Sequence, residues 1–321
     1  MRNSIDVLND GSYIVQYYMG FVIYDNSGNL IASEKFQNPN WRSYNVEATS
    51  DGGFILAGGL GSIDALRLGK YSSSGSEEWI KDFNTEHREH LYAVTETSDG
   101  GFVASGVIMS DGCCGGLGSS VLIKTDSSGN LEWDKVFSYT SREENHVDSN
   151  GLVEADNGDI IFSSYGENSR ITRVNSNATS EIWTLNTGSI TGGHKYINKT
   201  SDGGLLIPSG NNLYKLDGSA NYLWQTKNIY AEDAFELSNG EIIVVSAANY
   251  SDLKRAIVYK YDASGQEILW EKDISKYIGG GGARERDQFN GVEDKDGNIV
   301  LILRDILIKL NLSDGDLFSL D

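Results

Sequence analysis

The feature that most constrains this chain is a short motif that returns several times along it. The motif Thr-Ser-Asp-Gly-Gly, followed by an apolar run that ends in another Gly, begins at Thr49, Thr97 and Thr200. Weaker copies keep an Asp or Asn, a Gly and the apolar run. Counted by its first glycine, the motif occurs at Gly11, Gly52, Gly100, Gly158, Gly203, Gly240 and Gly297, at intervals of 37 to 58 residues. Such self-similarity predicts a fold built from repeated supersecondary units.

Each repeat has a second half, in which a strand, a short turn and another strand lead to a tryptophan. It is clearest from Val121 to Trp133, where the turn runs from Asp126 to Gly129. Four other repeats have a tryptophan at the same place, and the first and seventh have Ala32 and Ser319 near it; the four are Trp79, Trp183, Trp224 and Trp270. Asp-Gly and Asn-Gly pairs favour hairpin turns, so one repeat reads as four antiparallel strands. In the third repeat we expect them at His90–Thr97, Gly101–Val107, Ser120–Thr125 and Leu131–Phe137.

Four-stranded antiparallel units that repeat radially are the blades of a β-propeller. We therefore predict an all-β chain that forms a single seven-bladed β-propeller over residues 1–321. The expected blades are about 1–38, 39–85, 86–140, 141–187, 188–228, 229–275 and 276–321. Because the chain begins on the first strand of blade 1 and ends on the last strand of blade 7, the ring should close without strand exchange. This seam should be the weakest joint, and the five tryptophans should lie buried as wedges between blades.

The spacing Asp126-x-x-Gly129-x-x-x-Trp133 resembles the tryptophan-docking motif of quinoprotein-like (PQQ-like repeat) propellers, although the turn is about one residue shorter. The Thr-Ser-Asp-Gly-Gly half resembles repeats of uncharacterised bacterial and viral propeller proteins. The resemblance covers essentially the whole chain and implies the fold. It implies little about function, because the quinoprotein group contains both enzymes with a quinone and a metal and scaffold subunits without a cofactor.

The charge of the chain excludes some partners. It carries 46 Asp and Glu against 26 Lys and Arg, a formal net charge of −20. Such a field repels phosphate backbones and anionic membrane surfaces, so we expect no nucleic-acid binding. No run of about 18 apolar residues exists and the first residues lack the apolar core of a signal peptide, so we expect a soluble protein without membrane insertion. The sequence leaves the localisation open: an extracellular protein and a virion-associated protein are both compatible with it.

Signatures of cofactors, metals and common catalytic centres are weak. The two cysteines, Cys113 and Cys114, are adjacent, and we interpret them as a loop tip, although quinone enzymes of the resembling group carry a vicinal disulfide. His87 and His90 have no metal-ligand spacing on a helix, and Gly279 to Gly282 form a tether rather than a phosphate loop. We expect neither a cofactor nor a metal.

The two rims of the predicted ring differ in their chemistry. One rim consists of short, similar turns, whereas the other holds the links between blades and all irregular loops, where binding residues usually lie. The cationic, imidazole and aromatic residues of that loop rim are our candidate ligand-binding residues: Trp41, Arg42, His87, Arg88, His90, His146, His194, Tyr277, Arg284 and Arg286. They are suited to an acidic sugar, a carboxylate or an acidic loop of a protein.

Acidic residues occur on the first strand of most repeats, and first strands line the channel of a propeller. They are Asp6, Glu47, Glu96, Glu154, Glu236 and Glu293. Two interpretations stay open: a solvated channel wall, or groups that hold waters or a cation.

Two functions fit the sequence. The first is a non-enzymatic binding or scaffold propeller, such as a surface or virion component that engages a glycan or a protein through the loop rim. The alternative is a polysaccharide-processing lyase on the same rim, with His as base, Tyr as acid and Arg neutralising a uronate. The fold alone does not choose between them.

Overall fold

The computed structural model of the chain describes residues 3–61, 65–84, 88–109, 118–137, 151–164, 169–188, 196–209, 211–227, 229–247, 255–277, 289–303 and 306–318. Within these ranges the chain forms seven separate four-stranded antiparallel sheets, each built from four consecutive strands. The only helix in the described ranges is the 3-10 turn η1 (Ser275–Tyr277). No helix in them is long and apolar enough to cross a membrane.

The seven sheets follow the order of the repeats. Blade 1 contains β1 (Ser4–Val7), β2 (Tyr13–Tyr17), β3 (Gly20–Tyr24) and β4 (Leu30–Lys35). Blade 2 contains β5 (Trp41–Ala48), β6 (Phe54–Leu60), β7 (Ala65–Tyr71) and β8 (Glu77–Asn84). Blade 3 contains β9 (Arg88–Glu96), β10 (Phe102–Met109), β11 (Gly118–Thr125) and β12 (Leu131–Phe137). Blade 4 contains β13 (Leu152–Glu154), β14 (Ile160–Ser164), β15 (Ser169–Val174) and β16 (Glu181–Gly188).

The remaining three blades repeat the same order. Blade 5 contains β17 (Asn198–Lys199), β18 (Leu205–Ser209), β19 (Asn212–Leu216) and β20 (Tyr222–Lys227). Blade 6 contains β21 (Ala231–Glu236), β22 (Ile242–Ala247), β23 (Ala256–Tyr261) and β24 (Ile268–Asp273). Blade 7 contains β25 (Phe289–Glu293), β26 (Ile299–Leu303), β27 (Ile306–Leu310) and β28 (Leu317–Phe318). The prediction of seven blades of four antiparallel strands is confirmed.

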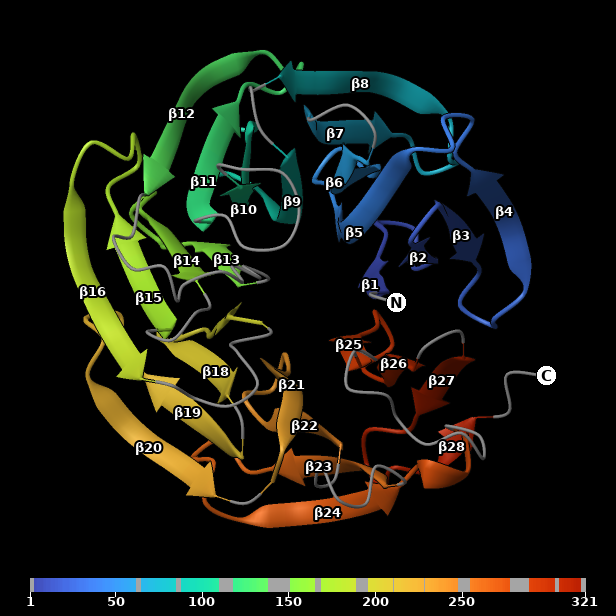
Figure 1. The fold of residues 1–321 in the computed structure, drawn as a ribbon. Coiled ribbons are helices and arrows are strands. Elements are labelled where there is room, and N and C mark those ends of the chain that lie inside the picture. The colour runs from blue at the N-terminus through green and yellow to red at the C-terminus, as the bar shows by residue number, and fades with distance from the viewer. Residues whose placement is uncertain are drawn as a thin grey trace.

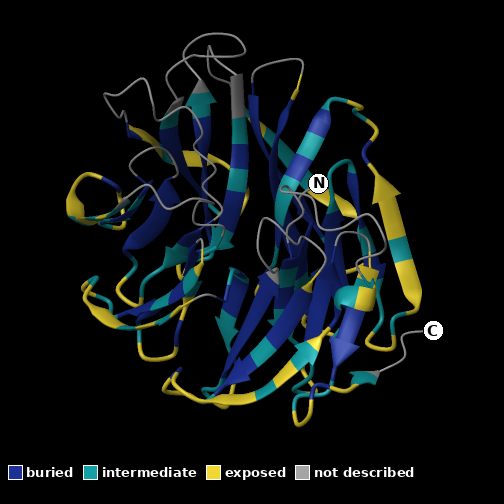
Figure 2. Ribbon diagram, turned by 60° about the horizontal axis from the view of Figure 1, so that its bottom comes forward, coloured by how far each residue is buried: buried dark blue, intermediate teal, exposed yellow. Residues whose placement is uncertain are grey.

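The blades stand in a ring around a central axis, with the first strand of each blade innermost and the fourth outermost (Figure 1). The middle strands β6, β14, β18 and β26 are buried along their whole length, whereas the outer strands are largely exposed (Figure 2). Because apolar side chains fill the spaces between neighbouring sheets, each blade is stabilised by the two blades beside it. This scaffold fixes the first strands and the loops at their ends.

In each of blades 2 to 7, a buried or half-buried Lys or Arg of the third strand pairs with an acid in the first turn of the same blade. Lys70 pairs with Asp51 at 2.8 Å, and Lys124 pairs with Asp99 at 3.0 Å. The other pairs are Arg173–Asp159, Lys215–Asp202, Lys260–Glu241 and Lys309–Asp294. The aspartate also accepts hydrogen bonds within its own turn, as Asp51 does from Gly53 and Thr49. The Thr-Ser-Asp-Gly-Gly motif is therefore a turn that is locked to the third strand.

Three of the outer-strand tryptophans, Trp79, Trp224 and Trp270, contact the second turn of the following blade. The ring of Trp79 lies where a Cβ on Gly129 would be 2.8 Å away, and Trp224 lies against Gly265 in the same manner. Trp270 Nε1 donates a hydrogen bond of 3.1 Å to the carbonyl of Leu312 in the seventh blade. The five indoles are half-buried rather than fully buried, because each also forms part of the outer surface.

The ring closes without strand pairing between its first and last blades, since β1 and β25 belong to different sheets. Apolar residues of both blades form one cluster at the seam, in which Ile5 and Val15 meet Val300 and Ile302. The first strand, β1, lies on the inside of the ring, and the last strand, β28, lies near its periphery (Figure 1). Closure without strand exchange is therefore confirmed.

Candidate functional site

The structure describes the side chains of four of the ten predicted binding residues, namely Trp41, Arg42, His90 and Tyr277. Arg88 begins β9, but its side chain is outside the described part. His87, His146, His194, Arg284 and Arg286 lie outside the described residues, as do Cys113, Cys114 and the four glycines from Gly279.

Arg42 and His90 belong to one group of side chains, which we call the tyrosine cluster: Tyr18, Arg42, Tyr44, His90 and Tyr92. Tyr44 lies at its centre, with ring centroids 5.8 Å from Tyr18, 5.4 Å from His90 and 4.9 Å from Tyr92. The guanidinium carbon of Arg42 lies 5.1 Å from the centre of the Tyr18 ring. Residues of three successive blades therefore meet at one place.

Two β-bulges of the same kind position the central tyrosines. In β5, Ser43 and Asn45 pair with consecutive residues of β6, so Tyr44 between them is unpaired. In β9, Leu91 and Ala93 pair with consecutive residues of β10, so Tyr92 is unpaired in the same way. The bulges bring the two strands so close that a Cβ at Gly58 or Gly106 would collide with the backbone oxygen of the partner strand. A bulge re-aims the extra side chain, so the same irregularity in two neighbouring blades brings two phenols together.

The tyrosine cluster lies on the loop rim. Tyr18 is in the turn between β2 and β3, and the other four residues lie in the first half of the innermost strands β5 and β9. All five side chains are partly exposed. Aromatic rings and polar groups are thus partly accessible together at the inner side of the loop rim.

Arg42 differs from the cations of the turns in its partners. Those cations each face a carboxylate, whereas Arg42 has no carboxylate partner among the described residues, and its Nε is buried without a hydrogen bond. Gly61 leaves room for this side chain, since a Cβ there would lie 2.6 Å from a guanidinium nitrogen of Arg42. The guanidinium is held by an aromatic ring and retains its capacity to bind an anion.

Trp41 lies in the core rather than in the cluster. Its side chain is only 2% exposed and stacks on Phe36, with ring centroids 3.7 Å apart. The guanidinium carbon of Arg67 lies 5.1 Å from the centre of the indole, and Arg67 is held by an ion pair with Asp82. Because blade 1 has Ala32 in place of the tryptophan wedge, this aromatic stack of Trp41 fills the boundary between blades 1 and 2.

Tyr277 is not brought to the tyrosine cluster either. It ends η1 after the sixth blade, where its ring packs against the core cluster of blades 6 and 7 and lies 4.7 Å from Lys276 Nζ.

The acids predicted on first strands connect neighbouring blades. The carboxylate of Glu96 accepts hydrogen bonds from the N–H and the hydroxyl of Ser50, at 2.7 and 2.8 Å, in the preceding blade. We call this contact the Ser–Glu bracket. It recurs as Ser98–Glu154 and Ser238–Glu293, and through the N–H alone as Ser201–Glu236. Between blades 4 and 5 the bracket is replaced by an ion pair of Asp156 with Lys199, at 2.5 Å. Among the described residues, no three His, Cys, Asp or Glu side chains group closely enough to hold a metal ion.

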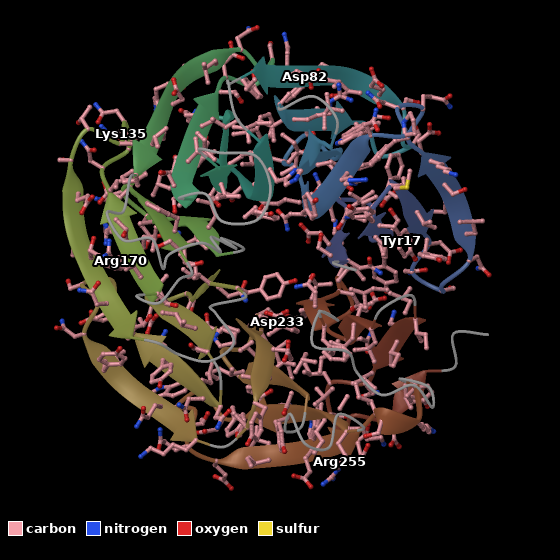
Figure 3. The ribbon with its side chains drawn as sticks, viewed as in Figure 1. Tyr17, Asp82, Lys135, Arg170, Asp233 and Arg255 are labelled. Atoms are coloured by element: carbon pink, nitrogen blue, oxygen red, sulfur yellow. The ribbon has the colours of Figure 1, made fainter. Side chains whose placement is uncertain are left out.

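Three further acids accept backbone hydrogen bonds across blade boundaries. Asp6 accepts from Ala48 N, Glu47 from Glu96 N and Asp233 from Gly291 N. Burial, followed by the charge of Asp6, raises the pKa of Glu47 to about 8. Burial likewise raises the pKa of Asp6, and it raises the pKa of Asp233 to about 6 although the latter also accepts hydrogen bonds from Ala234, Asn290 and Asn198. Asp233 lies on the inner side of the ring (Figure 3).

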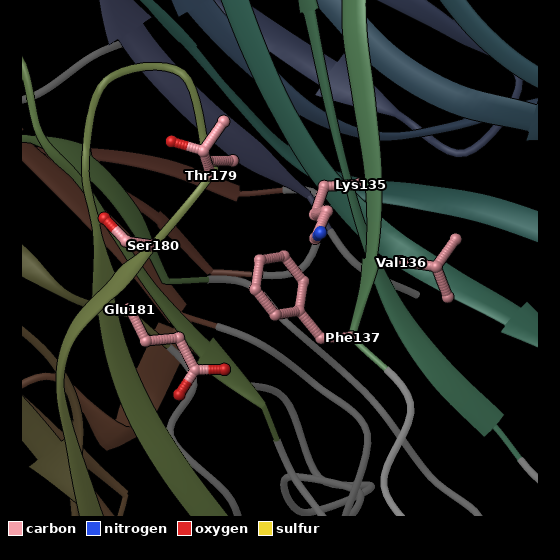
Figure 4. A pocket seen from close by; sticks show the side chains of 7 residues that line it. Lys135, Val136, Phe137, Thr179, Ser180 and Glu181 are labelled. Atoms are coloured by element: carbon pink, nitrogen blue, oxygen red, sulfur yellow. The ribbon is translucent and has the colours of Figure 1, made fainter.

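A separate groove of about 440 Å³ lies at the outer edge, between β12 and the turn from β15 to β16. Phe137, Lys135, Thr179 and Glu181 are among its lining residues (Figure 4). It contains none of the predicted binding residues.

Three members of the cluster were not predicted from the sequence, namely Tyr18, Tyr44 and Tyr92. The available signal was a tyrosine eight residues before the marker glycine in two successive repeats, together with Gly58 and Gly106 at the end of the apolar run. Arg42 and His90 were found because they are cationic residues at blade links.

No protein-family model matches the sequence, and no curated protein sequence matches it. Solved structures resemble it strongly in shape. The WD40 domain of Pan2 from Neurospora crassa has a TM-score of 0.62 at 10% identity, covering 93% of this chain and 84% of that one. A europium-containing methanol dehydrogenase has a TM-score of 0.60 at 9% identity, and the match covers 94% of this chain and 72% of that one. BamB from Moraxella catarrhalis has a TM-score of 0.56 at 10% identity, and the match covers 95% of this chain and 83% of that one. At such identities the similarity establishes one property of this chain, its β-propeller fold.

Proposed function

We propose that this protein is a binding propeller that recognises a glycan or a protein partner through its loop rim, with the tyrosine cluster as the contact surface. The observation that carries the proposal is the convergence of three phenols, an imidazole and a guanidinium from three blades. Tyrosine and arginine are the side chains that most often dominate binding energy at protein surfaces. A rigid propeller holds such side chains in place, so little ordering is needed on binding.

The opposite rim supports this choice by contrast. Its turns are short and similar, and their polar side chains bond to their own turn, as Asp126 bonds to Asn130. An asymmetric ligand needs an asymmetric surface, which the loop rim offers.

A glycan array and a pull-down with the wild-type protein test this function, with a Tyr44→Ala and Tyr92→Ala double variant beside it. We expect a partner that the double variant binds at least about tenfold more weakly, because truncation removes the central contact surface. Tyr222→Ala is the matched control, since Tyr222 is an exposed tyrosine on the outer strand β20. Binding that survives the double variant but is lost when Ser73, Ser127 and Ser219 of the turn rim are changed would contradict the proposal.

The alternative, a uronate lyase, is favoured by one specific observation: His90 lies beside Tyr44 with Arg42 in the same group. In such a reaction His90 takes the proton from C5 of the uronate, a C4–C5 double bond forms, and the C4–oxygen bond breaks. A tyrosine donates the proton to the leaving oxygen, and Arg42 neutralises the carboxylate. Absorbance of unsaturated uronate products identifies this activity, and it should disappear in His90→Ala.

A further inference from the structure

We propose that the tyrosine cluster binds a carboxylate-bearing saccharide, with Arg42 as the residue that selects the acid and the tyrosines as the platform for the sugar ring. This inference rests on the proposed function and narrows it to one ligand class.

Arg42 identifies the charge of the ligand. In a chain of net charge −20, this guanidinium lies on the face of Tyr18 and has no carboxylate partner among the described residues. Its planar array of donors matches a carboxylate in a bidentate geometry. Because the rest of the molecule is acidic, an anion gains attraction only where such a cation is accessible.

The tyrosines identify the body of the ligand. Tyr44 and Tyr92 have centroids 4.9 Å apart with planes inclined at 57°, and Tyr18 meets Tyr44 edge-on at 73°. Inclined, partly exposed phenols offer apolar faces to the C–H groups of a pyranose and hydroxyls to its oxygens. His90, 6.1 Å from Tyr92 by ring centroids, adds an imidazole to the same edge.

An extended acidic peptide fits this place less well. Peptides usually add to the free edge of a sheet by backbone hydrogen bonds. Here several N–H groups of the innermost strands are already bonded to side chains of the preceding blade, as Val94 N is to Asn45 Oδ1 and Val46 N is to Ser4 Oγ. The channel-facing edges of β5 and β9 are thus partly capped, which leaves side-chain recognition of a compact ligand.

The test is calorimetric titration of the full-length protein with trigalacturonate and with the same trisaccharide after reduction of its carboxyl groups. We expect binding of the acidic form only, weakening as salt rises from about 20 to about 200 mM. Arg42→Gln should weaken binding about tenfold or more, since it removes a charge-assisted contact. Arg255→Gln is the matched control, because Arg255 lies at the periphery beside Asp273 (Figure 3) and should leave binding unchanged.

Tyr92→Leu is a second variant, which keeps Arg42 in place. It should weaken the binding of the acidic trisaccharide, and the melting temperature of the protein should stay unchanged. Equal binding of both trisaccharides, or an Arg42→Gln variant that binds like the wild type, would overturn the inference. Binding of an acidic peptide alone would also overturn it, yet the proposed function would stand. A different result would refute the proposed function itself: neither the glycan array nor the pull-down finds a partner that depends on the tyrosine cluster.

Discussion

The backbone N–H of Ile5 donates a hydrogen bond of 3.0 Å to Oδ1 of Asn290, and this bond joins the first strand of the chain to the last blade. The same bond occurs inside the ring, where Val94 N donates to Asn45 Oδ1. The seam therefore uses a contact that an internal boundary also uses. It adds a buried network in which Tyr13 and Lys309 both bond to Asp294.

That network leads to a prediction about the seam. Lys309→Met should destabilise the fold by about 3 to 5 kcal/mol, because it leaves Asp294 without its cation in the interior. The Asp294 side chain is only 2% exposed, whereas Glu241, the partner of Lys260, is 23% exposed. Lys260→Met is thus the matched control and should cost about 1 to 2 kcal/mol. Urea unfolding of both variants measures the difference, and equal costs would mean that the seam network adds nothing.

The contact between tryptophans and turns predicts a second difference. Gly100 and Gly265 both have positive φ, 80° and 69°, but a Cβ at Gly100 meets nothing whereas one at Gly265 collides with Trp224. Gly100→Ala should therefore cost about 1 to 2 kcal/mol for the backbone alone. Gly265→Ala should cost about 1 to 3 kcal/mol more, because the indole must also move. Shifts in the urea midpoint test this order, and a smaller cost for Gly265→Ala would contradict the contact.

The raised pKa of Glu47 predicts an unusual pH dependence of stability. Its pKa is about 8 in the folded state against 4.5 for an ordinary Glu, so the folded protein holds a proton that the unfolded chain releases. The stability that this proton provides is complete below about pH 4.5 and is lost as pH rises toward 8. Asp233, with a pKa of about 6, acts in the same direction.

The melting temperature should accordingly rise as pH falls from about 8 to about 5. Glu47→Gln keeps an acceptor for Glu96 N and Thr95 but cannot ionise, so its melting temperature should exceed that of the wild type at pH 8 and converge with it in acid. The rise should end below about pH 4. Below that pH the stability contributed by Asp99 is lost as pH falls toward about 2: partial burial raises its pKa, but hydrogen bonds from Thr97, Gly101 and Lys124 outweigh this and hold the pKa at about 2. A flat profile between pH 5 and 8 would argue against a protonated Glu47.

The Asp156–Lys199 ion pair between blades 4 and 5, which replaces the Ser–Glu bracket, allows a test of charge. Lys199→Glu places an acid opposite Asp156, and at these exposed positions we expect a loss of about 0.5 to 1 kcal/mol. The double variant Asp156→Ser with Lys199→Glu recreates the Ser–Glu bracket and should recover most of the loss. A double-mutant cycle in low salt measures the coupling, and additive effects would show that the two side chains do not interact.

The fold could be predicted because each repeat encodes its own turns. In the third blade the predicted strand Leu131–Phe137 is found unchanged and the strand from His90 begins two residues earlier, at Arg88. The cation that locks each turn was missed, although a Lys or Arg stands two residues before the second turn in six repeats, as Lys124 does before Asp126. Its partner lies in another hairpin of the same blade, so spacing along the chain does not reveal the pair.

The candidate site could be predicted only in part. Residue type indicated Arg42 and His90, but it also indicated Trp41, whose place in the core follows from the missing wedge at Ala32. Tyr44 and Tyr92 enter the cluster through bulges, and a bulge is one unpaired residue that an alternating pattern does not mark. The binding roles predicted for His87, His146, His194, Arg284 and Arg286, which lie outside the described residues, stay predictions.

The Asp156–Lys199 pair has a consequence for how the ring assembles. In a chain of similar blades, a blade can pack against the wrong neighbour during folding or exchange with a blade of a second molecule. A blade carrying Lys199 that docked behind Ser50, Ser98 or Ser238 would find no carboxylate, and a blade carrying Glu96 behind Asp156 would meet like charge. The reversed charges at the boundary between blades 4 and 5 therefore distinguish it from the four boundaries that the Ser–Glu bracket joins, and they favour the correct pair of neighbours there.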